Sequence, residues 1–236
     1  SNLYIEQPLR TKCKNCSDTI DKPDFYKNQV PYTFCSNCGH LNGLHDDTNL
    51  FCNEVYKEDK GSSYAKNYST KDINTYNQRM EDIYLPKVDF LKKSLEELNE
   101  IPESMSYVDF GAGAGYFVKA LHESGMKNSI GYDVSDAQID IGNRMIGMGV
   151  LYCHNLDDTL EMASNIDVDV LSMIGVLEHV QHPRKILKAI SSNPSLRYLF
   201  ISVPTFSPSV FFEMVFPTVL NRHLCGGHTH LYTESS

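Results

Sequence analysis

Four of the seven cysteines stand in two pairs whose spacing suits a metal ion. Cys13 and Cys16 form one Cys-x-x-Cys pair, and Cys35 and Cys38 form the second. Two residues between thiolates let a tight turn place both sulfurs about 2.3 Å from one ion, and two such turns complete a tetrahedron. We therefore expect a closed, structural zinc site, with redox-active pairs or disulfides as the alternative. His40 follows the second pair, but the four cysteines already complete a ligand set.

A second cluster of unusual residues is a loop with glycine at alternate positions, Gly111, Gly113 and Gly115. The loop follows an apolar segment and precedes a helical one, and its glycines let the backbone pass close to a ligand. Asp133 ends the next apolar segment about 20 residues on, where a carboxylate accepts both hydroxyls of a ribose. The pattern predicts a nucleotide-cofactor site; a turn kept only for helix–strand packing is the alternative.

Two cofactor classes compete for this loop. Dinucleotide loops usually read G-x-G-x-x-G, but the slot of the third glycine is Tyr116 here. Asp109 precedes the loop, and a carboxylate there would repel a pyrophosphate but attract the ammonium of a methionyl group. The spacing therefore favours S-adenosylmethionine.

The elements that must position these residues follow from periodicity. Residues 72–100 read as a helix in two pieces around Pro86, with Pro102 closing it. One buried stripe of this helix comprises Val88, Leu91, Leu95 and Leu98. Strands are expected at 107–110, 129–134, 150–153, 168–174 and 198–203. Helices are expected at 116–124, from Ser135 in a capping box with Gln138, and from Pro183.

Strands that alternate with helices predict an α/β fold with a doubly wound, mostly parallel, Rossmann-like sheet. We expect three parts: a zinc-ribbon module at 1–56, a helical lead-in at 57–104 and a cofactor-binding core at 105–236.

Over residues 105–205 the chain resembles the class I S-adenosylmethionine-dependent methyltransferases. The resemblance lies in the segments 108–115 (VDFGAGAG), 131–135 (GYDVS) and 175–183 (GVLEHVQHP). It implies that the three glycines line the methionyl and ribose parts of the cofactor and that Asp133 takes the ribose hydroxyls. It also implies that Val134 packs on the adenine and that Asn155 and Leu156 hold the adenine edge. The family's sheet has seven strands, so a core ending after five is expected to be C-terminally incomplete, as in a fragment.

A four-cysteine ribbon ahead of such a core resembles the C-methyltransferases that act on nucleotide-linked sugars. Tyr64 and Tyr68 fit their tyrosine-bearing lead-in, which covers the cofactor, although packing onto the sheet edge is the alternative. The segment 226–232 (GGHTHLY) fits their histidine segment. The resemblance implies a small-molecule acceptor of that kind; O- or N-methylation of another small metabolite stays open.

Methylation of carbon needs a base that removes a proton beside a carbonyl, and histidine suits this near neutral pH. The candidates are His179, His182, His228 and His230, of which we favour His179, His228 and His230. His179 ends the fourth strand, at the edge where ligands bind in such sheets. The alternatives are a histidine that holds a helix start, for His179, and a surface loop pair, for His228 and His230. Glu178 is expected to be a hydrogen-bonding partner.

Composition narrows the function classes. Hydrophobic residues make up 41% of the chain, which is enough for a packed core. The formal charge of −9 disfavours electrostatic binding of nucleic acid by the whole chain. Apolar runs are shorter than a membrane span and no signal-peptide pattern opens the sequence, so we expect a cytoplasmic protein. Two rivals stay open: an RNA methyltransferase whose ribbon grips the RNA, and a methyltransferase-like fold used only for binding.

Overall fold

The computed structural model describes residues 2–54, 72–216, 218, 223–224 and 229–236. These residues fall into two compact units. The first takes in the described residues of 1–55, 175–184 and 203–236, and the second takes in those of 56–174 and 185–202. The predicted borders at 56 and 104 remain predictions.

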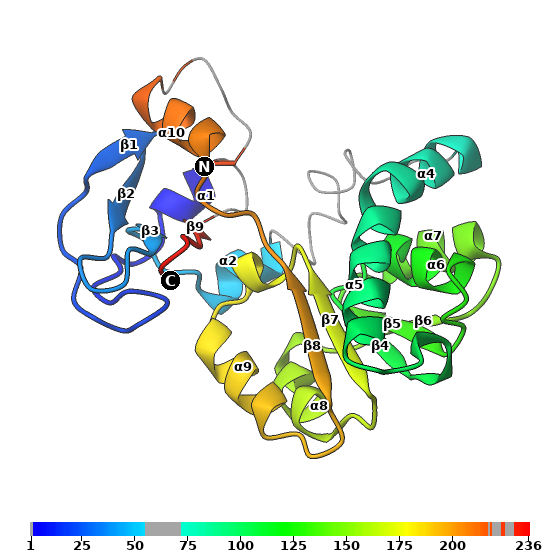
Figure 1. Ribbon diagram of the computed structural model, residues 1–236. Coiled ribbons are helices and arrows are strands. Elements are labelled where there is room, and N and C mark those ends of the chain that lie inside the picture. Colours follow the sequence, from blue (N-terminus) through cyan, green and yellow to red (C-terminus); the bar gives the residue numbers. More distant parts are fainter. Residues whose placement is uncertain (1, 55–71, 217, 219–222, 225–228) are drawn as a thin grey trace. The chain divides into compact units, whose positions relative to one another are not determined.

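The second unit is built on a five-stranded parallel sheet, in the order β6-β5-β4-β7-β8 (Figure 1). The strands are β4 (Tyr107–Phe110), β5 (Ser129–Asp133), β6 (Leu151–Cys153), β7 (Val170–Ile174) and β8 (Tyr198–Ser202). This confirms the α/β fold with a doubly wound parallel sheet. Because the order reverses between β4 and β7, the carboxyl ends of these strands form a topological switch point, where ligands bind in such sheets.

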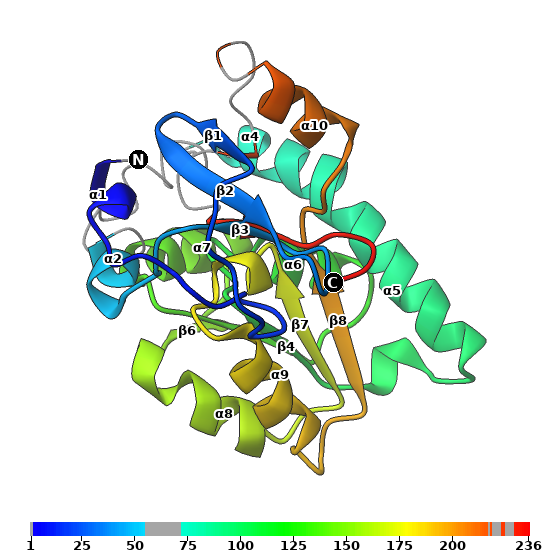
Figure 2. The same cartoon turned by 90° about the vertical axis from the view of Figure 1, so that its left-hand side faces the viewer.

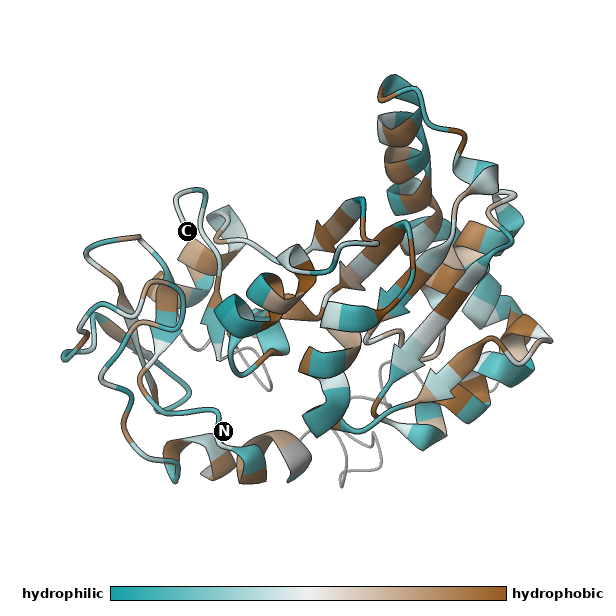
Figure 3. Cartoon of the chain, turned by 90° about the horizontal axis from the view of Figure 1, so that it is seen from below, coloured by the Kyte–Doolittle hydropathy of each residue, from teal (hydrophilic) through white to brown (hydrophobic). Residues whose placement is uncertain are grey.

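Helices cover both faces of this sheet. Figure 1 shows α5, α6 and α7 on one side and α8 and α9 on the other. Their bounds are α5 (Leu85–Glu97), α6 (Tyr116–Glu123), α7 (Asp136–Ile146), α8 (Thr159–Asn165) and α9 (Pro183–Ser191). Short 3-10 turns lie at η3 (Pro102–Ser104) and η4 (Leu156–Asp158). In Figure 3 the helices alternate between hydrophobic and hydrophilic residues, as expected for helices with one face on a core.

The lead-in helix is divided around Pro86, as expected, with a π-helical turn before the second piece. It runs as α4 (Ile73–Arg79), a π-helical turn η2 (Met80–Tyr84) and then α5, so Pro86 falls in the first turn of a new helix, where its missing N–H costs nothing. Three of the four predicted stripe residues are buried, but Leu98 caps the helix and is 57% exposed. That member of the predicted stripe was wrong, because the helix ends before it.

The predicted capping box is also wrong in its bonding. Ser135 is the N-cap of α7, yet its side chain makes no capping bond. Its backbone N–H instead donates to Asp133 Oδ1 over 2.9 Å. The helix start is therefore tied to the aspartate that ends β5.

The first unit carries an antiparallel sheet in the order β1-β2-β3-β9 (Figure 2). Its strands are β1 (Phe25–Lys27), β2 (Val30–Phe34), β3 (Leu41–Gly43) and β9 (His230–Leu231), and its helices are α1 (Asn2–Ile5), α2 (Asn49–Asn53), the 3-10 turn η5 (Leu177–His179) and α10 (Pro208–Val215). The β1–β2 hairpin turns at Asn28 and Gln29, both at positive φ, as a tight two-residue turn requires. In Figure 1 the red β9 lies beside the blue β3, so the end of the chain completes the sheet of the cysteine module.

Candidate functional site

The glycine loop joins β4 to α6, and its three alternate glycines all have left-handed backbone. The φ angles are 72° at Gly111, 53° at Gly113 and 72° at Gly115. A Cβ added at Gly113 would meet no atom within 4 Å, whereas one added at Gly115 would lie 2.6 Å from a methyl of Leu151. Gly115 is therefore needed for packing, and Gly113 leaves open space above the backbone. The packing interpretation of the loop therefore applies to Gly115, and the cofactor-binding interpretation stays a prediction.

Asp133 lies at the end of β5 and binds the tip of this loop. Its Oδ2 accepts the N–H of Gly113 over 2.7 Å, and its Oδ1 accepts the N–H of Ser135 over 2.9 Å. Burial raises the pKa of Asp133, while these two N–H groups oppose the rise. Each carboxylate oxygen has a further lone pair available. The arrangement can accept a pair of hydroxyl groups beside the open face of Gly113.

Asp109 lies inside β4 and is 2% exposed. Its Oδ1 accepts the hydroxyl of Ser172 on β7 over 2.6 Å. Burial raises the pKa of Asp109 to about 7, and the Ser172 bond opposes the rise. The structure thus places this carboxyl within the sheet, next to a neighbouring strand; a contact with a cofactor ammonium stays a prediction.

The loop after β6 presents one residue that the sequence interpretation missed. Asn155 and Leu156 are exposed there, and the Asn155 amide donates to Asp158. His154 is half-buried. Its backbone N–H donates to the backbone carbonyl of Asp133 over 3.1 Å, and its ring Nδ1 has no partner among the described residues. The pairing of β5 with β6, which sets Asp133 beside Cys153, brings it to this edge. The predicted Val134 is half-buried at the same edge.

Stacked tyrosines join the lead-in helix to the glycine loop. Tyr116 stacks on Tyr76, with ring centroids 4.2 Å apart, and on Tyr84, with centroids 5.2 Å apart. The hydroxyl of Tyr76 donates to the carbonyl of Ala114 over 2.7 Å. The predicted Tyr64 and Tyr68 lie outside the described residues. The signal that could have found Tyr76 and Tyr84 is their place on a helix that precedes the loop.

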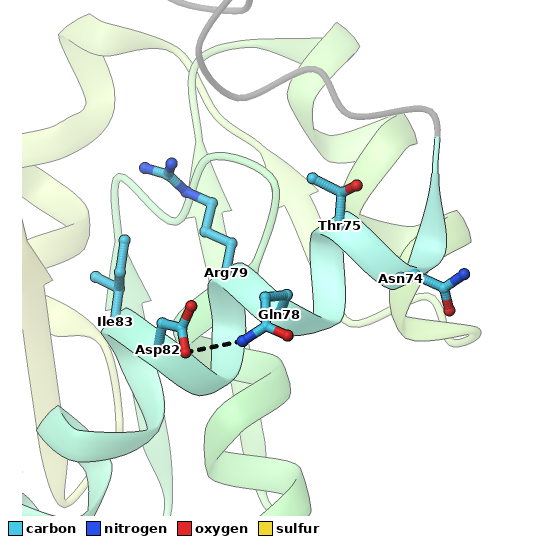
Figure 4. A pocket seen from close by; sticks show the side chains of 6 residues that line it. All are labelled: Asn74, Thr75, Gln78, Arg79, Asp82 and Ile83. Atoms are coloured by element: carbon cyan, nitrogen blue, oxygen red, sulfur yellow. Dashed lines mark hydrogen bonds between the residues drawn. The ribbon is translucent and has the colours of Figure 1, made fainter.

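A hollow of about 520 Å³ lies along the lead-in helix (Figure 4). It is lined by Asn74, Thr75, Gln78, Arg79, Asp82 and Ile83. The Gln78 amide donates to Asp82 across one turn over 2.9 Å. The lining residues include none of the predicted cofactor-binding residues.

In the first unit the two cysteine pairs come together. The ligand atoms of Cys13, Cys16, Cys35 and Cys38 all lie within 4.8 Å of one another. The Sγ atoms of Cys13 and Cys38 are 3.7 Å apart, and those of Cys16 and Cys35 are 3.5 Å apart. A tetrahedron of sulfurs about 2.3 Å from a central ion has edges of roughly 3.8 Å. The separations therefore fit one four-coordinate ion.

Both cysteine pairs form the same turn. The N–H of Ser17 donates to the carbonyl of Cys13 over 2.9 Å, and the N–H of Gly39 donates to that of Cys35 over 2.8 Å. Ser17 and Gly39 have φ angles of 65° and 71°. The repeated turn aims both pairs at a common point, as two knuckles around one ion do. His40 lies outside this cluster.

His40 instead contacts the predicted catalytic histidine His230. His40 Nε2 and His230 Nδ1 share a hydrogen bond of 2.8 Å, and the two side chains are fully or almost fully buried. Burial lowers the pKa of His230. The N–H of Gly43 donates to the carbonyl of Thr229 over 2.7 Å, which fixes the strand that carries His230. For His230, the surface-loop alternative is therefore wrong; His228 lies outside the described residues.

Four buried polar atoms in this unit have no hydrogen-bond partner among the described residues: Asp47 Oδ1, Glu178 Oε2, His230 Nε2 and Tyr232 Oη. The rings of His230 and Tyr232 lie with centroids 5.5 Å apart. Burial raises the pKa of Glu178 to about 7, and the nearby Glu178 adds to the burial that raises the pKa of Tyr232. His179 Nε2 lies 3.9 Å from Glu178 Oε1, and His182 is exposed. A carboxyl, an imidazole and a phenol are therefore available for acid–base or hydrogen-bonding chemistry.

Comparisons with known proteins agree with this architecture. The chain matches the model of the methyltransferase domain family over residues 76–236. Among solved structures, a magnesium protoporphyrin IX methyltransferase from Synechocystis PCC 6803 with bound SAH is 12% identical, with a TM-score of 0.55 over 79% of this chain and 84% of that one. No curated protein matches the sequence.

Two further solved structures are less similar in fold. An S-adenosylmethionine-dependent methyltransferase from Clostridium acetobutylicum ATCC 824 is 18% identical, with a TM-score of 0.43 over 60% of this chain and 58% of that one. The plantazolicin methyltransferase BpumL is 17% identical, with a TM-score of 0.47 over 70% and 59%. The chain thus spans less than two thirds of the length of these two proteins.

Among the described residues, every helix is too short or too polar to span a membrane.

The parallel sheet, the glycine loop at its carboxyl edge and a family match over more than half of the sequence agree with one another. The chain therefore belongs to the methyltransferase domain family and has the class I methyltransferase fold.

Proposed function

We propose that this protein binds S-adenosylmethionine at the glycine loop and transfers its methyl group to a small molecule. The cofactor supplies a methyl group already activated on a sulfonium. The observation that carries the proposal is the hydrogen bond from the N–H of Gly113 to Asp133. It places a carboxylate beside the open space at Gly113, which any side chain at that position would fill. The proposed cofactor-binding residues are Tyr64, Tyr68, Asp109, Gly111, Gly113, Gly115, Asp133, Val134, Asn155 and Leu156.

The residues present fit this cofactor. After accepting two backbone N–H groups, Asp133 has lone pairs left for the ribose diol. Gly113 leaves open space in which the cofactor can lie. His154 Nδ1, which has no partner among the described residues, adds a polar atom at the edge where an adenine would lie. The family match supports the same assignment.

The finer proposal is C-methylation of a nucleotide-linked sugar. It is supported by the four-cysteine module and by the buried His230, whose ring packs against that of Tyr232. The proposed catalytic residues are His179, His228 and His230. A neutral imidazole or a carboxylate can take the proton beside a carbonyl, and burial in this cluster keeps water from competing. That nucleic acid is not the acceptor, and that the protein is cytoplasmic, remain predictions.

We also propose that Cys13, Cys16, Cys35 and Cys38 bind one zinc ion. The sulfur separations and the two matching turns support a tetrahedral thiolate site, and four protein ligands leave no open position for catalysis. The ion would hold the first unit together. The division into a zinc ribbon at 1–56, a lead-in at 57–104 and a core at 105–236 is part of this proposal.

Calorimetry with S-adenosylhomocysteine tests the proposed function. We expect one site per chain and a loss of about 10-fold or more in affinity for Asp133→Asn, because the neutral amide is a weaker acceptor for the ribose diol. Asp140→Asn, on the exposed face of α7, is the matched control and should bind like the wild type. If folded wild-type protein gives no heat of binding, the proposed function is wrong. If Asp133→Asn and Asp140→Asn bind with equal affinity, Asp133 does not hold the ribose.

A further inference from the structure

The side chain of Asn42 lies between the two cysteine turns of the first unit. Its oxygen Oδ1 accepts the backbone N–H of Lys14, in the first turn, over 2.9 Å. Its nitrogen Nδ2 donates to the carbonyl of His40 over 2.9 Å and lies 3.5 Å from Cys13 Sγ. The same carbonyl accepts the N–H of Cys35, in the second turn, over 2.8 Å. One amide group therefore joins both turns.

The orientation of this amide follows from its partners. The backbone N–H of Lys14 offers a hydrogen, which only the amide oxygen can accept. The carbonyl of His40 accepts a hydrogen, which only the amide nitrogen can donate. The nitrogen carries two hydrogens, and one of them goes to His40. The second is left for Cys13 Sγ, so this contact is an N–H···S hydrogen bond.

The antiparallel sheet holds Asn42 in this place. Asn42 lies in the inner strand β3, where it pairs with Thr33 of β2 on one side and with His230 of β9 on the other. Its exposed fraction is 0%. Water therefore does not compete for the hydrogen bond to sulfur, and the amide is already in position before any ligand binds.

The hydrogen bond from Asn42 makes the two cysteine turns unequal. In each turn the sulfur of the first cysteine, Cys13 or Cys35, accepts two backbone N–H groups from within the turn. Hydrogen bonds of this kind stabilise the charged form of a thiol, which is the form that binds a metal ion. Asn42 gives Cys13 a third donor, which comes from a side chain outside the turn.

We propose that Asn42 is a positioning residue of the zinc site, whose amide joins the two cysteine turns and donates a hydrogen bond to the Cys13 thiolate. This inference rests on the proposed zinc site and deepens it. Four thiolates around one zinc ion carry a net charge of about −2. An N–H group directed at one of the sulfurs offsets part of that charge. Asn42 thus supports the ion without binding it, as groups that orient metal ligands do.

Competition with a chelator for zinc, measured on the full chain, tests this role. Asn42→Asp keeps an oxygen for the N–H of Lys14 but loses both amide hydrogens, and Asn42→Ser is neutral and too short to reach the sulfur. We expect the zinc affinity of both variants to fall by about 10–100-fold. The matched controls are Asn49→Asp and Asn49→Ser, at an exposed position of α2 in the same unit, which should bind zinc like the wild type.

The outcomes separate this inference from the zinc site on which it rests. A folded wild type that takes up no zinc would remove the site and the role of Asn42 together. If the wild type binds zinc and both Asn42 variants bind it with the same affinity, only the role of Asn42 is wrong. Circular dichroism of each zinc-loaded variant shows that it is folded, and Asn42→Ser decides if Asn42→Asp does not fold.

Cobalt in place of zinc distinguishes the hydrogen bond to sulfur from a general loosening of the module. An N–H donor withdraws electron density from a thiolate, so its loss should move the sulfur-to-cobalt charge-transfer band to longer wavelength in both Asn42 variants. The visible bands of a four-thiolate site should be kept, because the four ligands are unchanged. A charge-transfer band at the wild-type wavelength in the cobalt-saturated variants would overturn the bond from Asn42 to Cys13.

Discussion

The carboxylate of Asp133 accepts the backbone N–H of Gly113 over 2.7 Å, across the edge where β4 and β5 end. This bond couples the glycine loop to the next strand, so the loop is shaped by the same aspartate that is proposed to hold the ribose. Gly113 and Gly115 have different roles in this loop, and substitutions at the two positions should have different effects on stability and on ligand binding.

The first prediction concerns Gly113 and Gly115. Both have positive φ, so an alanine at either position costs about 1–2 kcal/mol of stability. At Gly115 the new methyl also collides with Leu151, which adds about 1–3 kcal/mol. Urea unfolding should therefore rank Gly115→Ala well below Gly113→Ala.

For ligand binding we expect the opposite order: Gly113→Ala, the more stable of the two variants, should bind the cofactor analogue more weakly. The methyl of Gly113→Ala enters the open space where the cofactor is proposed to lie, so its affinity for S-adenosylhomocysteine should fall by at least 10-fold although the protein is folded. Wild-type affinity in folded Gly113→Ala would show that the open space is not the ligand site.

The second prediction concerns the hydroxyl of Tyr76, which is buried and donates to the carbonyl of Ala114. Removing it in Tyr76→Phe leaves that carbonyl without its donor and should lower the free energy of unfolding by about 1–2 kcal/mol. Tyr26→Phe, at an exposed position of β1, is the control and should change stability little. Equal unfolding curves for the wild type and Tyr76→Phe would contradict the role of this bond.

The third prediction is a pH dependence of stability. The carboxyl of Asp109 ionises near pH 4 in the unfolded chain, but burial raises its pKa to about 7 in the folded protein. Between these values the folded state binds the extra proton, so stability falls as the pH rises from about 4 to about 7. Glu178, whose pKa is also about 7, acts in the same direction.

Thermal unfolding measured across this range should show the decline. Asp109→Asn cannot ionise, so its stability should change less with pH by an amount of the order of 1–3 kcal/mol. Asp140→Asn should keep the wild-type slope, because that side chain is exposed. A slope in Asp109→Asn as steep as in the wild type would mean that Asp109 is already ionised throughout.

The fourth prediction concerns the metal. Elemental analysis should find one zinc ion per chain, and Cys35→Ser should lose it, since three thiolates hold the ion far more weakly than four. A strong chelator should lower the melting temperature of the wild type, because structural zinc contributes folding free energy. Cys153→Ser, at an exposed cysteine outside the cluster, should keep both the metal and the melting temperature. Full zinc content in Cys35→Ser would contradict the four-cysteine site.

Local patterns predicted much of the fold. Strand lengths, the alternation of strands with helices and the position of Asp133 at the end of β5 all follow from short-range periodicity and turn chemistry. The Cys-x-x-Cys spacing likewise predicted the cluster that the four sulfurs form. These features depend on neighbours within a few residues.

The rest depended on contacts between distant segments. The pairing of His230 with Asn42 in β9 and β3 joins residues far apart in the sequence, and with it came the His40–His230 bond, which no local pattern indicates. The burial of Asp109 against Ser172 on a neighbouring strand was hidden for the same reason. The π-helical turn before Pro86, which lies against α6, was not predicted from the sequence either.

The most direct test of the account is an amide NMR titration of the wild-type protein with S-adenosylhomocysteine. We expect the largest shifts at Gly113 and Ser135, whose N–H groups donate to the Asp133 carboxylate, and at Gly111 in the same loop. Shifts confined to residues outside the glycine loop and the ends of β5 and β6, or no shifts at all at saturating ligand, would contradict the central claim.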